Sequence, residues 1–109
     1  MYTYKAKCLR VIDGDTIVAE VDLGFSTFKR VNVRLLGIDA PEVRTRDLKE
    51  KKKGLISKEY LEDIFAINKE FTLVSNKLDK YGRCLGTIMI GDLNVNEEMI
   101  ELDLAKIYE

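Results

Sequence analysis

The chain of 109 residues contains no histidine, and that absence excludes several kinds of catalysis. A Ser-His-Asp triad, a Cys-His pair and a histidine-ligated zinc ion all need imidazole groups. The two cysteines, Cys8 and Cys84, are far apart in sequence, so they cannot supply the ligand set of a structural zinc site. Acid–base chemistry must therefore come from carboxylates, lysine, tyrosine or a water bound to a metal ion.

Long apolar stretches are absent as well. No run approaches the ~20 apolar residues that a membrane-spanning helix requires. The first five residues, MYTYK, are polar and alternating, unlike a secretory signal peptide. We therefore expect an intracellular, cytoplasmic protein without membrane insertion, and secretion stays open for a chain whose leader has been removed. Cys8 is expected to be a small core residue, and the spacing does not decide whether it pairs with Cys84.

The charges nearly balance, with a formal net charge of −1 at pH 7. This balance argues mildly against a protein that binds nucleic acid, because affinity for phosphates comes from lysine and arginine. A local basic patch can coexist with a neutral total. Two interpretations of the basic run at residues 44–53 stay open: a solvated loop, which is favoured, and a nucleic-acid contact. The basic residues in this run are Arg44, Arg46, Lys49, Lys51, Lys52 and Lys53.

The hydrophobic pattern predicts five strands. Loose alternation of apolar and polar residues indicates strands at residues 2–12, 16–22 and 27–36, joined by short turns. Similar patterns at residues 70–76 and 84–90 predict the fourth and fifth strands. The first half of the chain is therefore expected to form a β-meander.

Two helices are predicted between and after these strands. Apolar residues recur at spacings of three and four from Gly54 to about Asn68, which indicates an amphipathic helix. The preceding residues 43–53 lack this period and are predicted as a loop. A second helix is predicted from the spacing of Val95, Met99, Leu102 and Ile107. Its N-cap is expected at one of two asparagines, Asn94 or Asn96.

The resulting order is β-β-β-α-β-β-α within one domain, residues 1–109, because a chain of this length is enough for one domain and not two. Five meandering strands with a helix between the third and fourth form the connectivity of an OB-fold barrel. The predicted fold class is mainly β with added helices. OB barrels often bind oligonucleotides, but a fold alone does not assign a function.

Three short segments concentrate acids and arginines: DGDT at residues 13–16, RLLGIDAPE at 34–42 and DKYGR at 79–83. Together they offer hard oxygen ligands for a divalent cation, a spare carboxylate and two guanidinium groups, which suits phosphodiester cleavage. Each segment also has a plainer interpretation when taken singly. The acids fit a hairpin turn and a strand end, and Arg34 fits the exposed face of a half-buried strand.

The three segments, in this order and on these predicted elements, resemble the staphylococcal-nuclease-like (thermonuclease) family. Weaker similarity at residues 95–97 (VNE) and 104–106 (LAK) extends the resemblance over nearly the whole chain. The resemblance implies an OB barrel with added helices and a calcium-dependent endonuclease, a hydrolase that leaves 3′-phosphate products. The implied substrate is DNA and/or RNA, single-stranded or frayed. A monomer is expected, and a homo-oligomer stays possible.

The resemblance also implies a metal-binding set. Asp15 and Asp39 resemble direct calcium ligands, and the backbone carbonyl of Ala40 resembles a third. Asp13 and Thr16 resemble polar residues that lie beside these ligands. Calcium prefers several oxygen ligands and tolerates irregular geometry, which suits loop carboxylates and a carbonyl.

Catalytic and substrate-binding roles follow from the same resemblance. Glu42 resembles the carboxylate that positions or activates the attacking water. Arg34 and Arg83 resemble the groups that hold the phosphate, and planar, always-charged guanidinium groups suit the developing negative charge. Lys80 and Tyr81 resemble the pair that binds a terminal phosphate.

Two other functions stay open beside the nuclease. Degenerate members of this family keep the barrel and bind nucleic acid or protein without cutting, and such members typically lose acids or arginines that this chain keeps. The slightly acidic net charge is what supports this alternative. A nuclease that needs a second copy or another protein to complete its substrate contacts is the third possibility.

Overall fold

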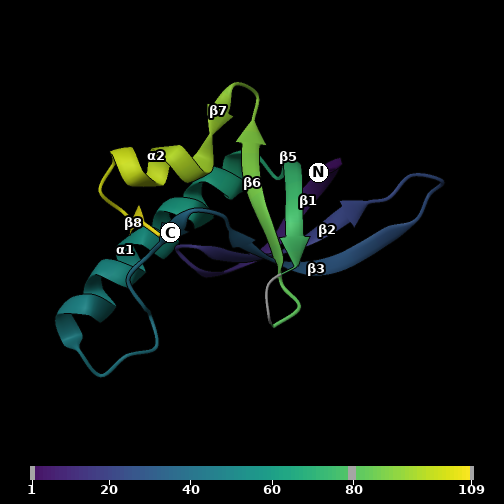
Figure 1. Ribbon diagram of the computed structural model, residues 1–109. Helices are drawn as coiled ribbons and strands as arrows, with labels where there is room; N and C mark the ends of the chain where they lie inside the picture. The colour runs from purple at the N-terminus through teal and green to yellow at the C-terminus, as the bar shows by residue number, and fades with distance from the viewer. Residues whose placement is uncertain (1, 79–80, 109) are drawn as a thin grey trace.

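The protein is described by a computed structural model that covers residues 2–78 and 81–108. Three strands, β1 (Tyr2–Asp13), β2 (Thr16–Asp22) and β3 (Phe28–Leu35), form the predicted antiparallel meander (Figure 1). On the other side of β1, β5 (Glu70–Leu78) pairs antiparallel with it and also with β6 (Cys84–Ile90). A parallel pairing between β3 and β6 closes the five strands into a barrel. The predicted mainly β barrel with OB connectivity is confirmed.

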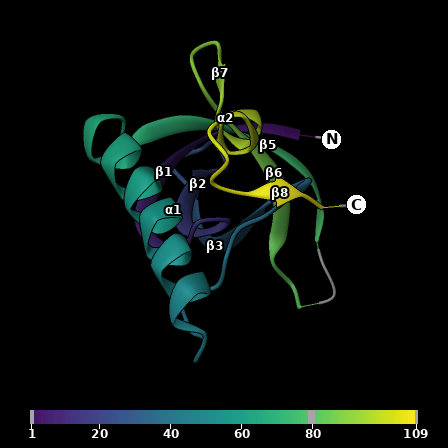
Figure 2. The same ribbon diagram turned by 90° about the vertical axis from the view of Figure 1, so that its left-hand side faces the viewer.

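Two helices and three very short strands complete the described elements. Helix α1 (Leu48–Ile67) follows β4 (Ile38–Asp39) and lies along one side of the barrel (Figure 2). After β7 (Leu93–Asn94) comes α2 (Val95–Glu101), and the chain then reaches β8 (Lys106–Ile107). The antiparallel pairing of β8 with β4 returns the carboxy-terminal segment to the end of the meander.

The barrel interior is filled by the inward-facing residues of the strands. Val33 of β3 and Ile88 of β6 are fully buried, and Leu61 of α1 and Met99 of α2 pack into the same core. Burying one such side chain stabilises the fold by roughly 1.5–3 kcal/mol. A Cβ at Gly86 would come within 2.7 Å of Leu73 Cδ1, so glycine lets β6 approach its neighbour where the barrel closes.

Helix α1 begins at Leu48, so the predicted loop over residues 43–53 is wrong from that point onward. Asp47 caps the helix, since its Oδ1 accepts hydrogen bonds from the backbone N–H groups of Lys49 at 3.0 Å and Glu50 at 3.3 Å. Lysine has good helix propensity, but the lysine-rich first turns bury no apolar side chain. The apolar period therefore begins only after the helix has started.

Helix α2 starts as predicted, with Asn94 as its N-cap accepting from the Glu97 N–H at 3.0 Å. The other candidate, Asn96, is buried and takes a different role. Its amide group bonds the backbone of Ile88, Leu36 and Gly86, at distances of 3.0–3.1 Å. This side chain therefore fastens α2 to the barrel strands.

The predicted extension of the second helix to Ile107 is wrong, because α2 ends at Glu101. Asp103 adopts a left-handed conformation with φ of 59°, and its N–H bonds the Ile100 carbonyl at 3.0 Å. The next N–H, of Leu104, bonds the Met99 carbonyl at 2.8 Å. This Schellman arrangement terminates the helix and releases the chain toward β8.

Both cysteines are free thiols. Cys8 is half-buried against the core, as predicted for a small core residue, and Cys84 is buried with its Sγ 3.3 Å from Ser75 Oγ. Among the described residues, no helix is long and apolar enough to cross a membrane.

Candidate functional site

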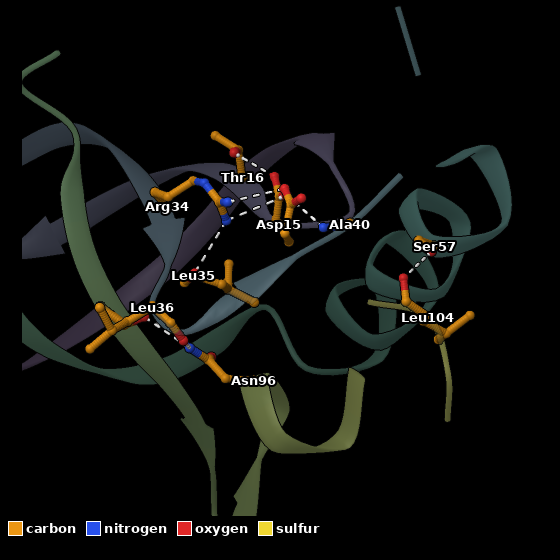
Figure 3. A network of polar contacts seen from close by, with 11 residues as sticks. Asp15, Thr16, Arg34, Leu35, Leu36, Ala40, Ser57, Asn96 and Leu104 are labelled. Carbon is orange, nitrogen blue, oxygen red and sulfur yellow. Dashed lines mark hydrogen bonds and ion pairs between the residues drawn. The ribbon is translucent and has the colours of Figure 1, made fainter. Parts of the chain in front are cut away.

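The acids predicted to bind a metal come together around Arg34. Arg34 lies in β3 opposite Thr16 of β2, so its side chain reaches the turn that joins β1 to β2. Its Nη1 is 3.4 Å from Asp15 Oδ2 (Figure 3). Its Nη2 is 3.5 Å from Asp39 Oδ1 in β4. One guanidinium group thus lies beside two carboxylates from separate elements.

Asp15 is held from several sides. The residue is only 7% exposed, and a buried carboxylate needs polar partners to offset the loss of hydration. Its Oδ1 accepts from Thr16 Oγ1 at 3.0 Å, and its Oδ2 accepts from the Ala40 N–H at 2.8 Å (Figure 3). The bond to Ala40 fixes the chain directly after β4 beside the turn between β1 and β2.

The donor chemistry of this cluster fits a cation that prefers oxygen. Asp15 and Asp39 offer carboxylate oxygens at the place where the Ala40 backbone is anchored. Within residues 2–78 and 81–108, no group of three or more histidine, cysteine, aspartate or glutamate side chains has metal-binding geometry. A cation such as calcium, which takes about six to eight oxygens, would therefore draw most of its ligands from backbone, water and substrate.

Asp13 and Glu42 lie at the edge of the same cluster. Burial raises the pKa of Asp13, and the negative charges of Asp15 and Glu42 raise it further, while a hydrogen bond with the Val43 backbone and the charge of Lys58 oppose the rise. Glu42 is exposed and lines a groove together with Asp39 and Ala40. Its carboxylate is therefore close to the acids and open to solvent.

The loop that carries Glu42 packs against α1 at a position that only glycine allows. A Cβ at Gly54 would meet the carbonyl oxygens of Pro41 and Glu42 at 2.7 Å each. These atoms belong to the backbone and cannot turn away as a flexible side chain could. Gly54 thus sets the distance between the helix and the loop.

A second close approach involves Gly14 and Ser57. A Cβ at Gly14 would lie 2.6 Å from Ser57 Cβ and 2.9 Å from Ala40 Cβ. Ser57 is 1% exposed, and its hydroxyl donates to the Leu104 carbonyl at 2.6 Å (Figure 3). One face of α1 therefore supports the acidic turn, the loop after β4 and the segment before β8.

Of the predicted arginine pair, Arg34 lies in β3 and Arg83 directly precedes β6. The parallel register places Val33 beside Cys84 and Arg34 beside Leu85, so Arg83 directly precedes the strand that flanks Arg34. The Arg83 guanidinium carbon lies 5.4 Å from the centre of the exposed Tyr81 ring. Lys80, the other predicted phosphate-binding residue, lies outside the described residues.

Tyr108 is a neighbour of Arg34 that the sequence motifs did not indicate. The guanidinium carbon of Arg34 lies 5.8 Å from the Tyr108 ring centre. Tyr108 reaches this place because β8 pairs with β4 and because its own N–H donates to the Gly37 carbonyl at 2.9 Å. Its position after residues 104–106, which resemble the family, was the only signal in the sequence.

The structure thus brings Asp15, Thr16, Arg34, Asp39 and Ala40 into direct contact, with Asp13 and Glu42 beside them. Tyr81 and Arg83 form a separate pair. Gly54 and Ser57, which hold the loops in place, were not predicted as part of the site.

Comparison with known proteins identifies several relatives of this chain. The chain is 36% identical over 104 residues to a protein of Escherichia coli named as an uncharacterized endonuclease, covering 94% of this chain and 60% of that protein. It is 31% identical over 106 residues to the thermonuclease of Staphylococcus hyicus, covering 95% of this chain and 58% of the thermonuclease. An uncharacterized protein of Methanocaldococcus jannaschii is 32% identical over 129 residues, with 96% and 59% covered.

The chain spans about three fifths of the length of these curated relatives. Residues 32–109, well over half of the chain, match the family described as staphylococcal nuclease homologue. This protein therefore belongs to the family of staphylococcal nuclease homologues.

Proposed function

We propose that this chain is a calcium-dependent endonuclease that hydrolyses DNA and/or RNA and leaves 3′-phosphate products. The observation that carries the proposal is the convergence of Asp15 and Asp39 on Arg34, at 3.4 and 3.5 Å. Acids that are partly or fully buried around one arginine leave an excess of negative charge, which a divalent cation compensates. The endonuclease and thermonuclease names of two relatives support the same activity.

Asp15, Asp39 and the Ala40 carbonyl would hold the calcium ion. When bound, the ion acts as a Lewis acid that polarises a phosphoryl oxygen of the substrate. The chain contributes the placement of these ligands: the Ala40 N–H orients Asp15, and the Arg34 guanidinium keeps both carboxylates near each other.

Glu42 is the proposed general base. It is exposed to solvent beside the acids, so it can accept a proton from a water that approaches the phosphorus. The new bond joins this water oxygen to phosphorus while the bond from phosphorus to the 5′ oxygen breaks. The departing 5′ oxygen takes up a proton from solvent, and the phosphate stays on the 3′ side.

The two arginines are proposed to stabilise the charge that develops on the phosphoryl oxygens. Arg34 lies in β3 and Arg83 directly precedes β6, and these two strands pair where the barrel closes. Tyr108 and Tyr81 each lie beside one of these groups, within the range of a cation–π contact. Tyr81 is further proposed to bind a terminal phosphate together with Lys80.

The proposal is tested by a Glu42→Gln variant assayed beside Glu50→Gln, which changes a carboxylate further along the same groove. A labelled single-stranded oligonucleotide is incubated with calcium, and the ends of the products are tested for removal of a 3′-phosphate. We expect Glu42→Gln to slow cleavage by about 10²-fold or more, within the range for removal of a general base, and Glu50→Gln to retain it. Equal rates for wild type and Glu42→Gln would refute the role of Glu42, and nucleic-acid binding without products would favour the binding module.

A further inference from the structure

A groove lies beside the proposed catalytic acids. It occupies about 610 Å³ and is lined by the first half of α1 and by the segment that leads into β8. Ala40, Ser57 and Ala105 are small residues in its lining, and Asp39 and Glu42 lie at the end that meets the site. A substrate strand that leaves the site in this direction would enter the groove.

Three lysines from both sides line this groove. Lys49 and Lys53 are one helical turn apart on α1, so they lie on the same face of the helix. Lys106 comes from β8, where it pairs with Asp39 of β4. Between described residues, none of the three lysines has a carboxylate within 4.0 Å.

Five acids line the same groove, and two of them already have partners. Asp39 contacts Arg34, Asp47 caps α1, and Glu42 is the proposed base. Glu50 and Asp103 also line the groove but do not pair with the lysines. Like charges one turn apart on a helix destabilise it by a few tenths of a kcal/mol, so Lys49 and Lys53 weaken the isolated helix slightly.

We propose that this groove binds the phosphates of a single-stranded nucleic acid on one side of the phosphate to be cut. The proposal rests on the proposed nuclease function and adds a substrate-binding surface to it. Lysine binds phosphate as a point charge without fixed geometry, which suits a strand of any sequence. The ligand class is therefore a polynucleotide strand that extends beyond the cut phosphate.

The test compares two triple variants with the same change in charge. Lys49→Gln, Lys53→Gln and Lys106→Gln remove the groove lysines, while Lys51→Gln, Lys52→Gln and Lys69→Gln remove exposed lysines that do not line the groove. Binding of a fluorescent single-stranded 12-mer and a dinucleotide is measured in chelator, without cleavage, at several salt concentrations. Circular dichroism checks that both variants fold.

For the groove variant we expect the slope of log affinity against log salt to fall by about 2, since each phosphate contact to a single strand contributes about 0.7. Affinity for the 12-mer should drop by about tenfold or more at low salt, whereas the control variant keeps most of its slope. Equal losses in both variants, or no binding of the 12-mer by wild type, would overturn the proposal. Cleavage is assayed separately. If the wild type does not cut nucleic acid but binds the 12-mer through the groove lysines, the proposed nuclease activity is refuted and the proposed binding groove is not.

Discussion

At the scale of single residues, the ion pair between Asp15 and Arg34 is the contact on which the site most depends. Both side chains are largely buried, at 10% and 13% exposure. Removing one partner of a buried pair leaves the other charge without compensation. The pair from Arg34 to Asp39 contributes less, because the Asp39 side chain is 39% exposed and solvent screens it.

An Arg34→Met variant should therefore lose stability as well as activity. We expect the free energy of unfolding in urea at neutral pH to fall by about 2–3 kcal/mol, because Asp15 stays buried without its cation. Arg30→Met is the matched control, since Arg30 is exposed on the same strand and should change stability by about 0.5 kcal/mol or less. Equal stability of the two variants would contradict the importance of the pair.

Cys8 gives a prediction that depends on pH. Burial raises the pKa of its thiol to about 11, against an opposing hydrogen bond with the Arg10 backbone. The thiolate is the reactive form, so alkylation of folded protein should be slow at pH 8 and should keep rising beyond pH 10. The measurement uses iodoacetamide on a Cys84→Ser variant, in which Cys8 is the remaining thiol. A rate that levels off near pH 9 would be inconsistent with the raised pKa.

The raised pKa of Cys8 also implies a small effect of pH on the stability of the fold. A group whose pKa is raised in the folded state holds its proton more tightly there than in the unfolded chain. Its contribution to folding is fully present below the pKa of the unfolded thiol and is lost as pH rises from about 9 to about 11. Stability should therefore decline over that range more in the chain with Cys8 than in Cys8→Ala.

At the scale of elements, α1 supports the loop that carries Glu42, and the contact between them is closest at Gly54. Alanine at a helix interior is normally favoured over glycine by about 1 kcal/mol. Here the added methyl group would meet two backbone oxygens at 2.7 Å, so the helix or the loop must move. We expect Gly54→Ala to lower the free energy of unfolding by about 1–3 kcal/mol, the usual cost of overpacking.

The displaced loop should also slow cleavage, because Glu42 would lie further from the acids. Urea denaturation and single-turnover cleavage of the same preparation measure the two effects. The control is Ile56→Ala, a change on the half-exposed side of the same helix. A more stable and fully active Gly54→Ala protein would contradict the account of this contact.

At the end of α2, introducing a glycine is expected to stabilise the protein. Asp103 has a φ of 59°, a left-handed conformation that glycine adopts at little cost. Asp103→Gly should therefore raise the free energy of unfolding by about 0.5–1 kcal/mol. Asp92→Gly, in a turn where aspartate has no positive φ, should not stabilise the protein. A destabilised Asp103→Gly variant would mean that the aspartate side chain makes an important contact of its own.

The helices and strands show most clearly which features the hydrophobic pattern of the sequence can predict. The five long strands could be predicted because apolar residues are concentrated in them, with clear alternation in β6 and a continuous buried run in β2. The start of α1 could not, since its lysine-rich turns bury no apolar face. The end of α2 was missed because Asp103, which has the left-handed conformation after the helix, is not the glycine that usually marks such an end. The two-residue strands β4 and β8 carry too few residues for any periodic signal.

The candidate site also has residues that the sequence could predict and contacts that it could not. The acids and arginines are concentrated in short local motifs, so they could be proposed from the sequence. Contacts that depend on the pairing of β4 with β8 or on helix packing could not be found, because they join residues far apart in the chain. Tyr108 beside Arg34 and Ser57 bonded to Leu104 are two such contacts.

At the scale of the whole molecule, closure of the barrel places the candidate site. The parallel pairing of β3 with β6 brings the strand that carries Arg34 beside the strand that follows Arg83, and the turn after β1 meets the same end of β3. The α1 helix and β8 then border this end and form the walls of the lysine-lined groove. The fold thus supplies a rigid frame, and short loops supply most of the chemistry.

The central claim, that this arrangement cuts nucleic acid with a divalent cation, is tested most directly by one cleavage assay. A labelled single-stranded oligonucleotide is incubated at low salt with calcium or with chelator, using wild type, Asp15→Asn and the control Asp22→Asn on the distant end of β2. We predict cleavage that requires calcium, survives in Asp22→Asn and is lost in Asp15→Asn. Cleavage in chelator, or undiminished cleavage by Asp15→Asn, would contradict the account.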